Sequence, residues 1–135
     1  METTSCYCYF MIRGDFNPIE ISDKLNIKPT EYWSVGDLRG DGSRHTFAML
    51  QIGYILVEHP NIEVECLGAV KDLIGKEQLL NEIRSKHDVT YTVEIVPSIY
   101  EGISPVINFG NELLTFCAKT NTDIDLDMYV YPFAE

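Results

Sequence analysis

The chain has 135 residues, 45% of them hydrophobic and 23% charged, which is ordinary for a globular protein and fits a single domain over residues 1–135. Its 21 acidic and 10 basic residues give a formal net charge of −11. That charge argues against a nucleic-acid partner, whose phosphates need a basic face, and against an anionic membrane surface.

The N-terminus and the cysteines favour a cytoplasmic protein without a cofactor. METTSCYCYFMIRGD has neither a basic region nor a long apolar stretch, so it does not resemble a signal peptide. The four cysteines form no Cys-x-x-Cys pair and no histidine stands at ligand spacing, so we expect buried apolar residues and no metal site. On a strand, Cys6 and Cys8 would share one face.

The first elements are expected to be a strand and a well-specified helix. CYCYFMIRG is rich in aromatic residues and cysteine, which favours a strand. After it, Asn17 suits a helix N-cap, Pro18 the first helical position and Glu20 the reciprocal position of a capping box. Pro29 is expected to stop this helix within a turn.

The middle of the chain is expected to hold two strands with helical segments between them. HTFAMLQIGYILVE is apolar at both alternations, as in a central strand or a bent pair of strands, and Gly53 is expected to mark the bend. Asn61 suits the N-cap of a helix through IEVECLGAVKDLI, which Gly75 interrupts and KEQLLNEIRSKH resumes. VTYTVEIVP alternates like a half-buried strand.

The C-terminal part is expected to form a helix and then a strand with one acidic face. NELLTFCAKTN has helical spacing, and Asn121 suits a left-handed C-cap. In TDIDLDMYVYP, four apolar residues alternate with three carboxylates and a tyrosine, which predicts one core face and one carboxylate face. The apolar positions are Ile124, Leu126, Met128 and Val130, and the alternating polar positions are Asp123, Asp125, Asp127 and Tyr129.

The order β-α-β-α-β-α-β indicates an α+β protein. Two β-α-β halves joined by a helical connection suit a ferredoxin-like plan. We therefore expect a mixed or antiparallel sheet of about four to five strands, with helices packed on one face.

Two passages together resemble the bacterial domain-of-unknown-function family 4279. FMIRGDFNPIEISDKLNIKPTEYWSVGD supplies a strand, a capped helix, a Leu-x-Ile-x-Pro-Thr passage and a Gly-Asp turn. PVINFGNELLTFCAKTNTDIDLDMYVY supplies a helix and a final strand with Asp125, Asp127 and Tyr129. The resemblance is loosest over residues 43–89. It implies a small single-domain fold in a bacterial, intracellular setting, and it brings no established activity or catalytic residues.

The stretch EYWSVGDLRGDGSRH is a glycine-rich loop with two interpretations. Trp33 could bury its ring and fix the loop to the body of the protein. Alternatively, the loop forms the rim of a ligand site at which guanidinium groups bind a carboxylate or phosphate. The rim residues are then Trp33, Gly36, Asp37, Arg39 and Arg44.

The alternating carboxylates of Asp123, Asp125 and Asp127 also leave alternatives open. They could be a solvated edge, a docking surface for a basic protein or, least favoured, a metal site. A calcium-binding EF-hand loop would need glycine and glutamate where Met128 and Ala134 stand.

No catalytic motif supports an enzyme, so we expect a non-enzymatic intracellular protein-binding domain. The most concrete version is an immunity-type inhibitor that neutralises a basic toxin domain. The alternative is a small-molecule-binding regulatory domain of ferredoxin-like plan, and an enzyme ranks third.

Overall fold

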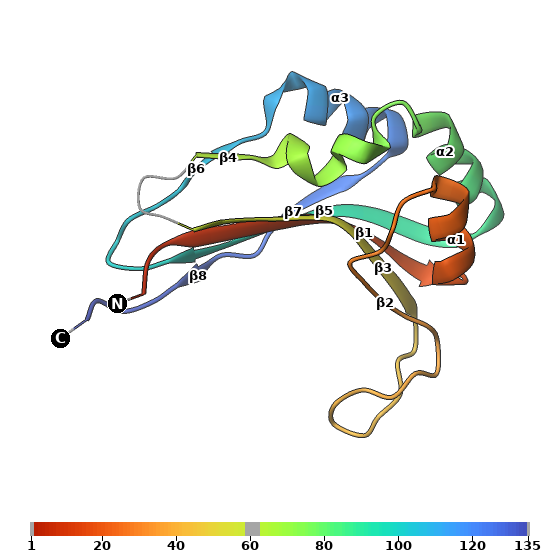
Figure 1. The fold of residues 1–135 in the computed structure, drawn as a ribbon, viewed down its shortest axis with the longest axis horizontal. Helices are drawn as coiled ribbons and strands as arrows, with labels where there is room; N and C mark the ends of the chain where they lie inside the picture. Colours follow the sequence, from red (N-terminus) through yellow and green to blue (C-terminus); the bar gives the residue numbers. More distant parts are fainter. Residues whose placement is uncertain (1, 59–62, 135) are drawn as a thin grey trace.

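A computed structural model describes residues 2–58 and 63–134 as a sheet with helices along one face (Figure 1). The main sheet has six strands in the order β2-β3-β1-β5-β7, with β8 also paired to β5. Their bounds are β1 Ser5–Asp15, β2 Glu31–Trp33, β3 Ala48–Glu58, β5 Asp88–Ile99, β7 Asp123–Leu126 and β8 Tyr129–Val130. A second sheet pairs β4, Glu63–Glu65, in parallel with β6, Val106–Asn108. The helices are α1 Pro18–Leu25, the 3-10 helix η1 Cys66–Leu73, α2 Glu77–Lys86 and α3 Gly110–Thr120.

The α+β class is confirmed, and most of the sheet is antiparallel. Strand β1 is antiparallel to both of its neighbours, β3 and β5, whereas β7 and β8 run parallel to β5. The ferredoxin-like strand order is not confirmed, and the main sheet has six strands where four to five were expected. Among the described residues, no helix is long and apolar enough to span a membrane.

The hydrophobic core lies between the helices and the face of the sheet that they cover. On β1, Cys6, Cys8, Phe10 and Ile12 are completely buried and alternate with partly exposed residues. The prediction that Cys6 and Cys8 share a face is therefore confirmed. The core continues through Tyr91, whose hydroxyl donates to the Leu80 carbonyl oxygen of α2 at 2.6 Å.

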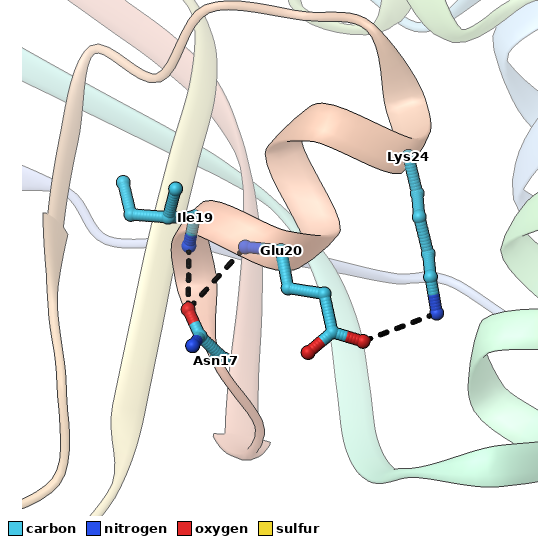
Figure 2. A network of polar contacts seen from close by, with 4 residues as sticks. All are labelled: Asn17, Ile19, Glu20 and Lys24. Atoms are coloured by element: carbon cyan, nitrogen blue, oxygen red, sulfur yellow. Dashed lines mark hydrogen bonds and ion pairs between the residues drawn. The ribbon is translucent and has the colours of Figure 1, made fainter.

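Helix α1 begins where its sequence predicts. The Asn17 side-chain oxygen accepts hydrogen bonds from the backbone N–H groups of Ile19, at 3.1 Å, and Glu20, at 3.3 Å (Figure 2). The Glu20 carboxylate lies 3.3 Å from the Lys24 ammonium and forms an ion pair one helical turn further on. The helix ends at Asn26, which has φ +55°, so a left-handed cap closes it before Pro29 is reached.

Gly53 marks a β-bulge in β3, as its position in an apolar run predicts. The register with β1 shifts between Cys8, which pairs with Ile55, and Phe10, which pairs with Ile52. Gly53 has φ +72°, and a Cβ atom there would lie 2.0 Å from the Ala69 carbonyl oxygen of η1. A glycine is required because the backbone of η1 touches the sheet at this point.

The helix predicted through residues 62–74, with Asn61 as its cap, is wrong over Glu63–Glu65, and over Cys66–Leu73 a helix does form but is of the 3-10 type. Asn61 lies outside the described residues, β4 occupies Glu63–Glu65, and a 3-10 helix follows over Cys66–Leu73. The apolar spacing of Cys66, Ala69 and Leu73 is genuine, and all three are buried. Strand β4 forms because Val64 pairs with Ile107 of β6, a distant partner that local spacing cannot indicate.

The final strand has the predicted extent but not the predicted core face. Strands β7 and β8 keep one register along β5, because Thr92 pairs with Asp123 and Ser98 with Tyr129. Of the apolar positions only Ile124 packs on the core, whereas the exposed fractions are 51% for Leu126, 47% for Met128 and 68% for Val130. The reason is that β7 lies at the sheet edge, while α3 packs against α2 and η1.

Candidate functional site

The helices leave the opposite face of the main sheet uncovered, and the loop between β2 and β3 projects from that side (Figure 1). Strand alternation and register decide which side chains lie there. Tyr9 pairs with Glu94, and Glu94 pairs with Asp125, so one row crosses three strands. We call this surface the open face; its central residues are Tyr7, Tyr9, Tyr54, Glu94, Asp123, Asp125, Asp127 and Tyr129.

Three tyrosines form a stacked aromatic group on the open face. The ring centroids of Tyr7 and Tyr9 are 6.1 Å apart with an interplanar angle of 10°, and those of Tyr7 and Tyr54 are 5.6 Å apart at 29°. Burial, followed by the negative charge of Glu94, raises the pKa of Tyr9 to about 12. The group therefore presents uncharged aromatic surface with phenolic hydroxyls, a combination favoured in protein interfaces.

Carboxylates lie beside these rings. Asp125 and Asp127 are exposed, and the Tyr129 hydroxyl donates to an oxygen of Asp127 at 3.2 Å. Glu94 is half-buried, and burial is the main cause that raises its pKa to about 7. The charge of Asp125, a hydrogen bond to it and the charge of Asp127 add to that shift, while Arg13 opposes it. The open face therefore carries more carboxylates than there are cations near them.

Arg13 is the cation whose charge opposes the rise in the pKa of Glu94, and it also contacts the ring of Phe47. Its guanidinium carbon lies 4.1 Å from the centroid of the Phe47 ring, in a cation–π arrangement. Within residues 2–58 and 63–134, the geometric criteria for an ion pair are met by Glu20 and Lys24 alone. The aspartates of the open face therefore have no cationic partner within the described residues.

The structure places Trp33 at the base of the β2–β3 loop. Its ring stacks on His45 with centroids 4.0 Å apart, and its indole N–H donates to the Phe47 carbonyl oxygen at 2.9 Å. The side chain is half-buried by these contacts. Such contacts fix the loop to the sheet, as one of the two interpretations of Trp33 requires, and they leave the ligand-rim interpretation untested.

The loop itself is organised by hydrogen bonds. Gly36 N–H donates to the His45 carbonyl oxygen at 2.8 Å, and His45 N–H donates to that of Asp37 at 2.9 Å. The Asp37 carboxylate accepts from Ser34 N–H, and the Arg44 guanidinium donates to the Gly36 carbonyl oxygen. Gly36, Asp37 and Arg44 thus serve the loop's own structure.

Arg39 lies at the tip of the loop, where hydrogen bonds from Ser43, and to a smaller extent the charge of Arg39, lower the pKa of Asp41. Arg39 is exposed, and its backbone N–H donates to the Ser43 carbonyl oxygen at 2.8 Å across the loop tip. Within the described chain its guanidinium has no hydrogen-bond or ion-pair partner. The two predicted sets of site residues lie apart, because β2 and β7 occupy opposite edges of the sheet.

Sequence reasoning missed the tyrosines and Glu94 as site residues. The signal was present, since Tyr7 and Tyr9 alternate with Cys6 and Cys8, and Glu94 is the one charged residue within VTYTVEIVP. These residues could not be combined into one site from the sequence, because the sequence does not show that β5 lies between β1 and β7. In the described part of the chain, no cluster of three or more His, Cys, Asp or Glu side chains could hold a metal ion.

The fold is thus that of a small α+β protein with an uncovered sheet face that is acidic and tyrosine-rich. A family model described as "Domain of unknown function (DUF4279)" matches residues 4–131. The chain belongs to this family, as the resemblance of its two end passages predicted. Comparison with curated proteins and with solved structures gave no match.

Proposed function

We propose that the protein is a non-enzymatic binding domain whose open face docks a basic surface of another protein. The observation that carries the proposal is the row of Tyr9, Glu94 and Asp125 across three strands. Asp123 and Asp127 lie two residues before and after Asp125 along the same edge. Aromatic rings supply desolvated contact area, and carboxylates without counter-ions supply long-range attraction. A lysine- or arginine-rich surface of a partner would contact the aromatic rings and would be attracted by the carboxylates.

The most concrete form of this function is an immunity-type inhibitor in a bacterial cell. A basic toxin domain would meet the open face, and its active cleft would be covered. The net charge of −11 speeds such an encounter by electrostatic steering, which weakens as salt rises. This role needs no catalytic group, no cofactor and no metal, and it involves neither nucleic acid nor a membrane.

The test removes the charge of the predicted aspartates and compares partner capture. The face variant carries Asp123→Asn, Asp125→Asn and Asp127→Asn. The control carries Asp23→Asn, Asp72→Asn and Glu82→Gln, three exposed residues of α1, η1 and α2, so its net charge changes equally. Affinity capture from lysate of the source organism is quantified by mass spectrometry at low and high salt.

We expect a stoichiometric basic protein that the native chain and the control capture, and that the face variant loses. Its capture should weaken with salt. The result that overturns the proposal is equal capture by the face variant and the control, because general charge would then account for binding. If the captured protein is a toxin domain, the same variants are tested for protection of cells that express it.

A small-molecule-binding regulatory domain is the second candidate function. The observation in its favour is the hydrogen-bonded β2–β3 loop, which holds the exposed Arg39 guanidinium on a pre-organised tip. A ligand carboxylate or phosphate would bind there and change the fluorescence of Trp33, the only tryptophan. Arg39→Ala should abolish the change, and Trp33 emission that is indifferent to a panel of anionic metabolites would refute this role.

A further inference from the structure

The outer edge of β7 and β8 is a continuous extended segment without a neighbouring strand in the described residues. Its backbone hydrogen bonds to β5 continue through the gap between the two strands, because Asp127 N–H donates to the Ile95 carbonyl oxygen at 2.9 Å. Beyond β8, Tyr131 N–H donates to the Ile99 carbonyl oxygen at 3.0 Å. The residues from Asp123 to Tyr131 therefore form one edge strand.

This edge presents both open hydrogen-bonding groups and apolar side chains. Since Asp127 and Tyr131 direct their N–H groups inward, alternation directs those of Leu126, Met128 and Val130 outward. These three side chains are 51%, 47% and 68% exposed. Proteins usually protect an edge with charged side chains, proline or a bulge. Within residues 124–130 the charged side chains are Asp125 and Asp127, which lie on the open face, and no lysine, proline or bulge interrupts the strand.

We propose that a second copy of this chain pairs with this edge, antiparallel, with Met128 opposite Met128 of the second copy. The two copies are then related by a two-fold axis perpendicular to the sheet. The two main sheets join into one, the helices of both copies cover the same side, and the two open faces lie next to each other. This dimer does not rest on the proposed function: pairing uses the edge, and Tyr9 and Glu94 of each open face lie on the inner strands β1 and β5, whereas Asp125 and Asp127 lie beside the seam.

The register follows from the positions of the outward groups and the aspartates. Outward residues have to face outward residues, so even-numbered positions pair with even-numbered positions. Centring the pair on Leu126 places Asp125 opposite Asp127, and centring it on Asp127 places that residue opposite itself. Both arrangements bring carboxylates of equal charge together at cross-strand distance, which is unfavourable.

Centring on Met128 reduces this repulsion, because no carboxylate is then directly opposite another and the two Asp127 residues are only diagonal neighbours. Leu126 then lies opposite Val130, whereas Asp127 lies opposite Tyr129 and Asp125 opposite Tyr131, so both of these carboxylates meet a phenol, and Asp123 lies opposite Phe133. Moving the centre on to Tyr129 places Pro132, which has no N–H group, opposite Leu126 and reduces the number of complete backbone pairs. The Met128-centred register therefore combines the most complete hydrogen bonding with the best side-chain pairing.

Charge gives the dimer a salt dependence opposite to that of the basic partner. Each copy carries a net charge of −11, so two copies repel at low ionic strength and screening favours their association. The dimer dissociation constant should fall as salt rises. Capture of a basic protein should weaken over the same range, so the two proposals are distinguishable in one titration.

Cross-linking tests the register. Opposed residues in a hydrogen-bonded antiparallel pair have Cα atoms about 5.5 Å apart, within the range of a disulfide. Under oxidation with copper phenanthroline, Met128→Cys should give a disulfide-linked dimer. The native protein should give none, because its four cysteines are buried. Val106→Cys, which adds a thiol at a residue 57% exposed on β6, is the matched control and should not cross-link efficiently.

Sedimentation equilibrium tests the association itself. Met128→Arg places two equal charges at the two-fold axis and should raise the dimer dissociation constant at least about tenfold. Val106→Arg should leave it unchanged, and circular dichroism should show both variants folded. A native chain that stays monomeric at every concentration and salt would overturn the proposal, as would a dimer that neither Met128 variant affects. Pairing of the edge with a strand of another protein instead would also overturn it.

Discussion

Glu94 and Asp125 occupy paired positions on the parallel strands β5 and β7, and their carboxyl groups share the open face. Burial first, and then the charge of Asp125, raises the pKa of Glu94 to about 7 from an ordinary 4.5. Tyr9 lies on the other side of Glu94, and Arg13 is the opposing cation. Near neutral pH the folded protein therefore holds a proton here that the unfolded chain releases.

The first prediction concerns the pH dependence of stability. Because the pKa of Glu94 is raised on folding, protonation stabilises the folded state fully below pH 4.5, and this contribution is lost as pH rises through 7. Glu94→Gln imitates the protonated form. It should be more stable than the native protein at pH 8 by about 1 kcal/mol, a value reduced for solvent screening of a half-exposed group, with little difference at pH 4.5.

Urea unfolding at several pH values between 4.5 and 8 measures this difference in the free energy of unfolding. Glu112→Gln, at an exposed residue of α3, is the matched control and should parallel the native curve. A constant offset between Glu94→Gln and the native protein across this range would contradict the link between Glu94 and stability.

The second prediction concerns the bulge at Gly53. Alanine there must adopt φ +72° and bring its Cβ atom to 2.0 Å from the Ala69 carbonyl oxygen unless the backbone moves. We expect Gly53→Ala to lower the free energy of unfolding by about 2–4 kcal/mol. At Gly40 a Cβ atom would meet nothing within 4 Å. Gly40→Ala should therefore change stability by less than about 0.5 kcal/mol, and similar losses for both variants would contradict the argument.

The third prediction concerns the N-cap of α1. Asn17→Ala removes the acceptor of two backbone N–H groups and should cost about 1 kcal/mol. Glu20→Gln removes the exposed ion pair with Lys24 and should cost only about 0.3–0.5 kcal/mol. Chemical denaturation of both variants at pH 7 provides the comparison. An equal or larger loss for Glu20→Gln would mean that the ion pair, and not the cap, stabilises this turn.

The fourth prediction concerns the attachment of the β2–β3 loop. Trp33→Phe keeps an aromatic ring beside His45 but removes the indole N–H that bonds the Phe47 carbonyl oxygen. The free energy of unfolding should fall by about 1 kcal/mol, because one partly buried hydrogen bond is removed. The neighbouring Tyr32 is 47% exposed, so Tyr32→Phe is the control and should be nearly neutral. Thermal unfolding that ranks the two variants the other way would refute this role of the indole.

Local signals in the sequence were reliable where a few neighbouring residues decide the structure. The cap of α1 needs only Asn17, Pro18 and the next backbone N–H groups, and the left-handed end of α3 needs only Asn121. The alternation of β1 was equally informative, since Cys6 and Cys8 lie on its buried face. These features were predicted because their energetics are contained within a few residues.

Other features depended on partners far along the chain. Strand β2 forms against Met49, Leu50 and Gln51 of β3. Three residues carry no periodic signal, so the sequence predicts a loop there. Strand β4 needs β6 in the same way. The open face needs β5 to lie between β1 and β7, so the nearness of Tyr9, Glu94 and Asp125 could not be foreseen.

The sequence by itself determined the α+β class, the N-cap of α1, the left-handed end of α3, the alternation of the final strand and membership of the DUF4279 family. Only the tertiary structure decided that Leu126, Met128 and Val130 are exposed at a sheet edge and that Glu94 lies against Asp125. The physical reason is that alternation sets the face on which a side chain lies, whereas burial and pKa depend on which strands and helices become its neighbours.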